Sequence, residues 1–234
     1  MCVRYTLHKS DAALGAISRA LGAPLEAPDW AGPRFNASIT STMPVVASAA
    51  GLPAVRPMRW GLVPPGERGK ARPRLLANAR SETAERLPAF RRGVAERRCL
   101  VPANGFYEWL PSGSVKLPYL FTLRGEEPFA FAGIWDSAAG PLPETYCILT
   151  TEPNELVARV HNRMPVILTA ETMGRWLGER PLAAEEFALL VRPLEAGRME
   201  SRPVSRYVSN SRNEGPRCLE PPDAAPPGLE LDFS

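Results

Sequence analysis

Four short strings combine reactive or amide-bearing side chains with strand-like surroundings: MCVR at residues 1–4, LANARSET at 76–83, VPANGFYEWL at 101–110 and HNRMPVIL at 161–168. Cys2 is distinctive, because removal of the initiator methionine would make it the first residue of the mature chain. A terminal cysteine carries an amine and a thiol on neighbouring carbons. The sequence contains no glycine-rich phosphate loop, no GxSxG elbow and no HExxH motif. Any chemistry must therefore come from these strings.

Taken one at a time, the polar side chains of these strings leave their roles open. Glu108 lies between two aromatic residues, where burial of a charge would be costly. Either strand alternation turns it toward solvent, or it is a functional carboxyl. His161 follows a short predicted helix, and a lone histidine is more often a surface or capping residue than a catalytic one. Asn78 and Arg80 would ordinarily be residues at the entry to a helix.

The composition is that of a globular protein. Of the 234 residues, 44% are hydrophobic and 23% are charged, so the chain can bury a core. No uninterrupted apolar stretch approaches the roughly 20 residues of a membrane helix. The N-terminus also lacks the apolar segment of a signal peptide. We therefore expect a cytoplasmic protein with no membrane partner.

The charge is unevenly distributed. The net charge is +3, but acidic residues gather after Asn213, which leaves residues 1–213 with a net charge of +7. Of the 28 basic residues, 25 are arginine, whose planar guanidinium binds phosphate oxygens bidentately. A GC-rich coding bias would also raise the arginine content. The charge permits an anionic partner and does not prove one.

The four cysteines predict neither a metal site nor a disulfide framework. Cys2, Cys99, Cys147 and Cys218 show no CxxC or other zinc-like spacing, and the chain has only two histidines. Cys99 and Cys147 lie in apolar runs and are predicted to be small core residues. We therefore expect no metal and no cofactor.

Strands are the main elements that must position these side chains. The pattern predicts strands at 1–6, 43–48, 56–63, 97–103, 105–110, 118–123, 129–135, 145–150 and 165–169. It predicts helices at 10–21, from near Ser81 to 87, and at 153–160, 171–177 and 185–190. Clustered strands with short, scattered helices indicate an α+β fold. We expect one domain at 1–214 and a Pro-rich, acidic and disordered tail at 215–234.

Six motifs occur in one order along the chain: MCVR at 1–4, WGLVP at Trp60–Pro64, NARSET at Asn78–Thr83, RCLVPANGFYEW at Arg98–Trp109, HNRMP at His161–Pro165 and PVSRYVSN at Pro203–Asn210. In this order they resemble the SOS response-associated peptidase (SRAP) family of abasic-site processing proteins, which crosslink to damaged single-stranded DNA. One motif alone could arise by chance, whereas six in order are specific.

The resemblance implies a single domain with a β-rich, barrel-like core and short peripheral helices. It implies a monomer whose partner is single-stranded DNA containing abasic sites, associated with the nucleoid in a bacterium, with lyase-type or peptidase activity. It assigns Cys2 as nucleophile after removal of Met1, Asn78 as the residue that orients the N-terminus, Glu108 as acid/base, His161 as a proton-transfer residue, and Arg4, Arg80 and Arg163 as ligands of flanking phosphates.

The chemistry of an N-terminal cysteine suits this assignment. The amine condenses with the open-ring aldehyde of an abasic deoxyribose to an imine, and the thiol then closes a thiazolidine ring. An α-amino group has a pKa near 7.7–8.0, so a sizeable fraction is free base at neutral pH. Opening the sugar requires a proton donor, which a carboxyl of raised pKa at Glu108 would supply.

The sequence departs from the family pattern at three places. Val3 stands where the family usually has glycine, and RFNASITS at 34–41 lacks the usual proline. After WGLVP the family usually has tryptophan in a loop that lines the DNA, whereas this chain has PGERGKARPR at 65–74. A basic loop is thus expected in place of a stacking wedge.

Two other functions remain open from the sequence. One is a peptidase in which Cys2 is the nucleophile and His161 its base, including autoproteolytic removal of Met1. The other is a non-covalent binder of single-stranded nucleic acid. The sequence identifies no protein partner.

Overall fold

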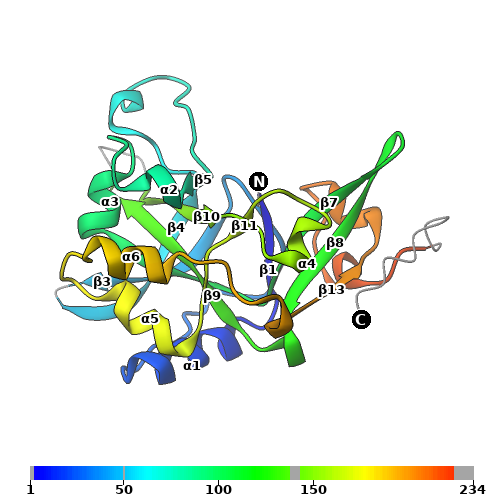
Figure 1. Ribbon diagram of the computed structural model, residues 1–234, viewed down its shortest axis with the longest axis horizontal. Coiled ribbons are helices and arrows are strands. Elements are labelled where there is room, and N and C mark those ends of the chain that lie inside the picture. The colour runs from blue at the N-terminus through cyan, green and yellow to red at the C-terminus, as the bar shows by residue number, and fades with distance from the viewer. Residues whose placement is uncertain (1–2, 50, 138–142, 224–234) are drawn as a thin grey trace.

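Two β-sheets organise the chain, which the computed structural model describes over residues 3–49, 51–137 and 143–223 (Figure 1). The strands are β1 (Arg4–Leu7), β2 (Arg34–Ser38), β3 (Thr42–Ala49), β4 (Leu52–Trp60), β5 (Asn78–Arg80), β6 (Arg98–Ala103), β7 (Gly105–Ser112), β8 (Val115–Leu123), β9 (Phe129–Asp136), β10 (Thr145–Thr151), β11 (Met164–Pro165), β12 (Ile167–Leu168) and β13 (Met199–Pro203). The helices are α1 (Ser10–Leu21), α2 (Ser81–Ala84), α3 (Arg91–Glu96), α4 (Glu155–Ala158), α5 (Ala170–Leu177) and α6 (Ala184–Leu190).

The larger sheet closes on itself. Its strand order is β11-β10-β4-β3-β6-β9-β12, with β5 added to β10. Because β9 also pairs with β10, the strands β10, β4, β3, β6 and β9 form a closed ring. The smaller sheet has the order β13-β8-β7-β1-β2. The prediction of an α+β domain with a β-rich, barrel-like core and short peripheral helices is confirmed.

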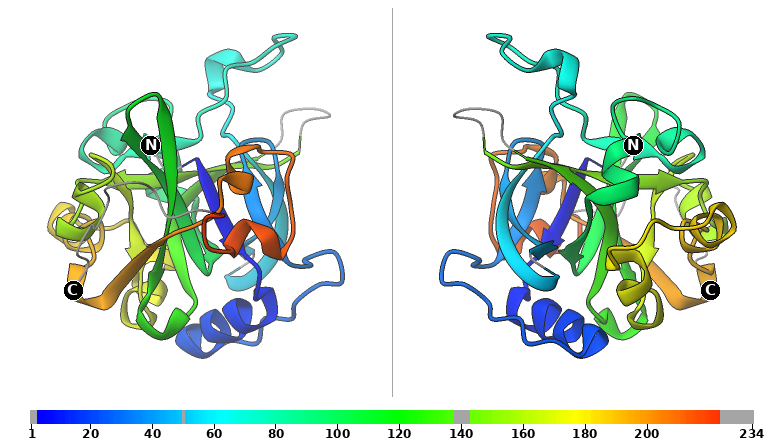
Figure 2. Two further views of the ribbon diagram at one scale, coloured as in Figure 1. Left: turned by 90° about the vertical axis from the view of Figure 1, so that its right-hand side faces the viewer. Right: turned by 90° about the vertical axis from the view of Figure 1, so that its left-hand side faces the viewer.

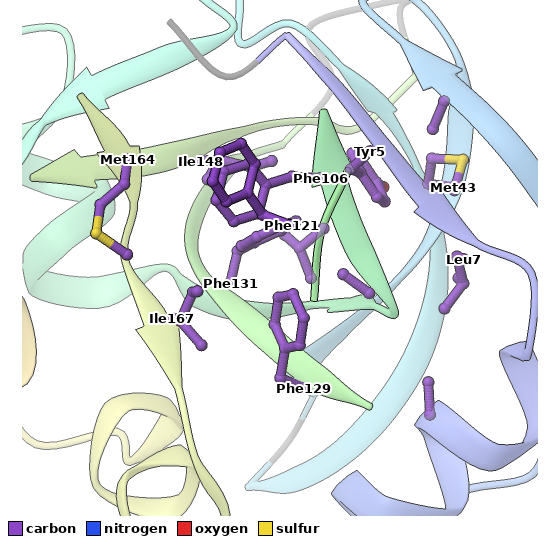
Figure 3. Close-up of a cluster of buried hydrophobic side chains, with 14 of the residues drawn as sticks. Tyr5, Leu7, Met43, Phe106, Phe121, Phe129, Phe131, Ile148, Met164 and Ile167 are labelled. Atoms are coloured by element: carbon purple, nitrogen blue, oxygen red, sulfur yellow. The ribbon is translucent and has the colours of Figure 1, made fainter. Parts of the chain in front are cut away.

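Aromatic side chains from both sheets fill the main core (Figure 3). Phe106 of β7 stacks on Phe121 of β8, with ring centroids 5.1 Å apart. Phe106 also meets Phe131 of β9 edge to face at 6.2 Å. Burial of such large rings is a main favourable term in folding. These contacts hold β7, and with it the Glu108 string, firmly against the ring of the larger sheet.

Strand β7 is buried on both faces at its start, so its burial does not alternate. Phe106 lies in the main core, while the next residue, Tyr107, packs with Val204, Val208 and Cys218 on the other face. Gly105 allows this close packing, since an added Cβ would lie 2.8 Å from the carbonyl oxygen of Phe121. Residues i and i+2 of a strand share a face. Glu108 therefore shares the inward face of Phe106.

The predicted tail is packed over its first part. Residues Pro216–Leu219 form a 3₁₀ turn, and Cys218 is fully buried against Tyr107. The boundary expected at residue 214 stays a prediction, and the packing of Cys218 was not foreseen because an isolated apolar thiol within a Pro-rich sequence gave no sign of its distant partners. Residues 224–234 of that predicted tail lie outside the described residues.

Helices cover the outside of the ring, and one segment projects from the body. Helix α1 runs from Ser10, as predicted, and ends at Gly22 in the left-handed conformation at φ 60°. The segment 65–75, between β4 and β5, extends away from the rest of the molecule (Figure 2). In the described part of the chain, no helix is both long and apolar enough to cross a membrane.

Candidate active site

The start of β1 is directed toward Glu108 by its pairing with β7. The two strands are antiparallel, with Tyr5 opposite Phe106 and Thr6 opposite Gly105. Continuing this register places Val3 across from Glu108. The predicted nucleophile, Cys2, lies outside the described residues.

Glu108 and His161 are brought together from distant parts of the sequence. Glu108 is only 3% exposed. The Nε2 atom of His161 lies 4.0 Å from the Oε2 atom of Glu108. The backbone N–H of His161 donates to the carbonyl of Val157 in α4, at 2.8 Å, so the end of this helix holds the imidazole in place. The Glu108 side chain is therefore buried, and the alternative that strand alternation turns it toward solvent is wrong.

Burial shifts the pKa values of these two groups in opposite directions. It raises the pKa of Glu108 to about 7, because a buried carboxylate loses hydration. It lowers the pKa of His161 for the converse reason. Glu108 is therefore partly protonated near neutral pH and lies beside a second titratable group, which is a feature of acid–base sites.

The other nitrogen of His161 can support either protonation state. Its Nδ1 atom accepts the backbone N–H of Arg163 at 3.0 Å and lies 3.2 Å from the carbonyl oxygen of the same residue. A neutral ring that accepts this N–H carries its proton on Nε2, which is the nitrogen nearest Glu108. A protonated ring would donate from Nδ1 to the carbonyl instead.

Two of the predicted phosphate ligands lie at the same end of β10. Thr150 of β10 pairs with Arg80 of β5 on one side and with Pro165 of β11 on the other. Arg80 is exposed, and Asn78, at the start of the same strand, is partly buried. Arg163 binds the Glu82 carboxylate bidentately at 2.5 and 3.0 Å and donates to the carbonyl of Thr150 at 2.7 Å. Of this pair, Arg80 is thus the more accessible cation.

Arg4, the third predicted phosphate ligand, has intramolecular partners. Its guanidinium donates to Asn36 Oδ1 at 2.8 Å and to the carbonyls of Val208 and Ser209 at 2.9 and 3.3 Å. It also lies over the ring of Trp109, 5.7 Å from the centroid. Arg4 therefore fastens the start of β1 to the segment 206–213.

Asn36 completes this fastening; sequence reasoning noted it only as part of the RFNASITS string and assigned it no role. It is 1% exposed, and its Nδ2 atom donates to the carbonyls of Val208, Asn210 and Asn213 at 2.9–3.1 Å. Asparagine is depleted in strands. An asparagine inside a strand-like string was therefore the available signal.

The described cysteines are poor nucleophiles. Cys99, Cys147 and Cys218 are fully buried, as predicted for the first two. Burial raises the pKa of each thiol, to about 11 for Cys218, and a thiol of raised pKa supplies little reactive thiolate. Among the residues that the structure describes, no three histidine, cysteine or acidic side chains gather in a way that could hold a metal ion.

Comparison with known proteins gives one consistent result. A family model described as SOS response associated peptidase (SRAP) matches residues 1–211. The abasic site processing protein YoqW of Bacillus subtilis (strain 168) is 33% identical over 192 residues, covering 80% of this chain and 86% of the relative. The abasic site processing protein HMCES of Gallus gallus is 32% identical over 191 residues, covering 70% and 56%. A crystal structure of a protein from Bacteroides thetaiotaomicron shares the fold, with a TM-score of 0.75 at 24% identity over 94% of this chain and 99% of the other.

Proposed function

The chain belongs to the SOS response-associated peptidase (SRAP) family, and from this membership we propose that it processes abasic sites in single-stranded DNA by covalent capture on Cys2. The observation that carries the proposal is the buried Glu108 carboxyl, whose pKa is raised to about 7, beside the His161 imidazole. A protein acting on DNA in this way would work in the cytoplasm, at the nucleoid in a bacterium, and would need no second copy of the chain.

Chain connectivity supports Cys2 as the partner of this acid. Val3 stands across from Glu108 when the β1–β7 register is continued. Consecutive Cα atoms are about 3.8 Å apart, which bounds how far residue 2 can be from Val3. Removal of Met1 would expose an amine and a thiol on this residue.

The proposed reaction joins the aminothiol to the open-ring aldehyde with loss of one water. The amine nitrogen attacks the aldehyde carbon, and the resulting carbinolamine loses water to give an imine. The thiol sulfur then adds to the imine carbon, and its proton passes to the nitrogen, which closes the thiazolidine ring. Protonated Glu108 supplies the proton that opens the sugar and the one that helps the hydroxyl depart. His161 accepts the proton that the C1′ hydroxyl releases when the sugar opens, and the one that the nitrogen releases when the imine forms, and returns each to Glu108.

We propose different roles in DNA binding for Arg80, Arg163 and Arg4. Arg80 is exposed beside the site and suits a direct phosphate contact. Arg163 has further N–H groups beyond those that bind Glu82, and Arg4 chiefly holds the chain start in register with β7. We propose that Asn78, on β5 with Arg80, orients the N-terminal residue.

The test is a denaturing gel with a labelled oligonucleotide that carries one abasic site. We expect a shifted band that survives SDS with the native protein and no such band with Cys2→Ala. The matched control is Cys218→Ala, which removes a buried thiol and keeps Cys2. An adduct of unchanged yield in Cys2→Ala would contradict the proposal.

Two companion measurements separate the alternatives. Mass spectrometry of the purified protein should show that Met1 has been removed, since a retained methionine blocks the amine. Cleavage of unrelated peptides without DNA, lost in Cys2→Ala and His161→Ala, would instead favour a peptidase. DNA binding without an adduct would favour a non-covalent binder.

A further inference from the structure

A cavity of about 150 Å³ lies between the projecting segment 65–75, α3 and the end of β9. Figure 1 shows α3 beside the tip of β9, with the projecting segment above it. The walls of the cavity include three arginines, Arg68, Arg92 and Arg97, together with Trp135 and Asp136. At about 30 Å³ of liquid per water molecule, the volume corresponds to roughly five waters, or one phosphate group with part of its sugar.

The three guanidiniums exceed the acidic charge of the cavity wall. Asp136 is the only carboxylate among the lining residues, and both of its oxygens are engaged, Oδ2 by Arg68 and Oδ1 by Arg97. Arg92 pairs with Glu96 one helical turn away, outside the lining, at 2.9 Å, and both side chains are more than half exposed. Each guanidinium has five N–H donors, so donors remain for an anion.

Trp135 gives the cavity an ordered wall. The guanidinium of Arg97 lies 5.5 Å from its ring centroid, and that of Arg56 lies 4.7 Å away. Arg97 is thereby held by the indole ring as well as by Asp136, at 19% side-chain exposure. A fixed planar guanidinium loses less entropy when it binds a tetrahedral anion.

We propose that this cavity is a subsite for a backbone phosphate of the DNA strand, remote from the lesion. The inference rests on the proposed function, because the ligand is the same strand. Asp136 pairs with Thr145 of β10, whereas Arg80 pairs with Thr150. Five residues of strand span about 17 Å, which equals about five nucleotides of stacked strand at 3.4 Å each. The phosphate held here is thus about five nucleotides from that held at Arg80.

The chain offers a charge-matched pair of double variants. Arg68→Gln with Arg92→Gln removes two guanidiniums from the cavity wall. Arg72→Gln with Arg91→Gln removes the same charge from the same segment and the same helix, at exposed residues that do not line the cavity. None of the four residues belongs to the reacting centre.

The experiment replaces each phosphate in turn by a neutral methylphosphonate. The oligonucleotide carries a tetrahydrofuran abasic analogue, which cannot open and so reports binding alone. With the native protein we expect a roughly tenfold loss of affinity at one position about five nucleotides from the analogue. In the Arg68/Arg92 double variant the loss at that position should fall below about twofold, while the Arg72/Arg91 control keeps the native pattern.

A native pattern in the Arg68/Arg92 variant would overturn the subsite, as would equal changes in both double variants. If the Arg68/Arg92 variant folds poorly, Arg92→Gln alone, at an exposed residue, can be used instead. It should reduce the loss of affinity caused by the methylphosphonate at the same position, though by a smaller factor than the double variant. A salt titration of binding to an undamaged strand is a second measurement, because it does not require the strand to bind in one fixed register. There the slope of log K against log salt should drop by about 0.7 per lost contact in the cavity variant and not in the control.

Failure of the subsite and failure of the proposed function give different results. An SDS-stable adduct with no position-specific loss and no change in salt slope removes the subsite alone. Absence of an adduct, with the salt-slope difference retained, removes the covalent function and leaves the phosphate subsite standing.

Discussion

At the residue scale, the behaviour of Glu108 follows from its burial beside a basic partner. A carboxyl that is 3% exposed would ordinarily need a cation to stay ionised. Its neighbour His161 is itself partly buried with a lowered pKa, so it is largely neutral above that pKa. Near pH 7 a proton therefore resides on Glu108 about half of the time. This is the condition under which a carboxylic acid is an effective proton donor at neutral pH.

The first prediction concerns the rate of crosslinking. Glu108→Gln keeps size and hydrogen bonding but removes the acid, so adduct formation should slow by roughly 10²–10⁴-fold. The native rate should be bell-shaped in pH, because the amine (pKa near 7.7–8.0) must be neutral while Glu108, with a pKa of about 7, must be protonated. Single-turnover crosslinking from pH 5.5 to 8.5 measures both.

In Glu108→Gln the alkaline decline should vanish, and the rate should rise with pH as the amine loses its proton. Glu85→Gln, at an exposed carboxyl in the turn after α2, is the control and should keep the native profile. A native rate in Glu108→Gln would remove this residue from the reaction.

The second prediction concerns stability. The folded pKa of Glu108, about 7, exceeds its ordinary value of 4.5, so between these pH values the folded state keeps a proton that the unfolded state has lost. The free energy of unfolding therefore falls as pH rises through this window, by up to about 3 kcal/mol above pH 7. Urea unfolding at pH 5 and pH 8 should show this decrease in the native protein.

Glu108→Gln should lose this component of the pH dependence, since its amide does not titrate. The difference between the two proteins cancels the groups that they share. If the two proteins change equally between pH 5 and pH 8, the carboxyl has an ordinary pKa.

At the element scale, the segment 206–213 is fastened to β1 and β2 by the Arg4 guanidinium and by the Asn36 amide. Asn36 Nδ2 points at three backbone carbonyls, those of Val208, Asn210 and Asn213. The two N–H groups of this amide face the three carbonyls while its Oδ1 accepts from Arg4, a combination that an aspartate cannot provide. The segment in turn covers Tyr107 and so buries the second face of β7.

Asn36→Asp should therefore destabilise the protein by about 3 kcal/mol or more, because a carboxylate would face three carbonyl oxygens in a buried position. Asn210→Asp is the matched control. The side chain of Asn210 is exposed and accepts the N–H of Arg212 at 3.0 Å, a role that an aspartate also fills. Urea unfolding of the two variants measures the difference, and equal stabilities would contradict the fastening role.

The packing of Cys218 against Tyr107, Val204 and Val208 also predicts where the chain can be shortened. Truncation after residue 214 removes the buried Cys218 and should lower the midpoint of thermal unfolding clearly, by several degrees. Truncation after Asp223 keeps every described contact and is the control, which should unfold at the native temperature. Equal midpoints for the two truncations would support the domain boundary expected from the sequence.

The sequence predicted the long strands and the helix from Ser10 well, because their apolar periodicity is strong. It missed α3, since RRGVAE has no apolar stripe. Gly93 lies there because an added Cβ would come within 3.0 Å of Ile134. It also read residues 165–169 as one strand, whereas β11 and β12 pair with β10 and β9 respectively. Such breaks are set by tertiary pairing and leave no local signal.

The sequence predicted which residues belong to the site, but neither their burial nor their distances from one another. Local pattern left Glu108 undecided, because the segment that covers the far face of β7 lies about 100 residues later in the sequence. Its approach to His161 likewise depends on the placement of α4 against the sheets. The motif resemblance supplied the roles, and the fold supplied the burial that explains the pKa values.

At the scale of the whole molecule, the acid is enclosed by the meeting of the two sheets. The smaller sheet contributes β7 with Glu108, and the chain that leaves the larger sheet after β10 contributes His161. Because Glu108 is almost fully buried, we expect that a sugar held within a stacked duplex does not reach its carboxyl. Under the proposed function, the reacting sugar must therefore leave the stack and enter the site.

The final prediction follows from this enclosure. An abasic site in single-stranded DNA should crosslink much faster than the same site centred in an intact duplex, because extrusion from a duplex costs a few kcal/mol, or roughly a hundredfold in rate. Single-turnover crosslinking of one labelled strand, alone and annealed, measures the ratio. A duplex with unpaired bases flanking the lesion is the matched control and should recover most of the single-strand rate. Equal rates on all three substrates would mean that the sugar reaches the amine without entering the enclosed site, and that Glu108 is not its acid.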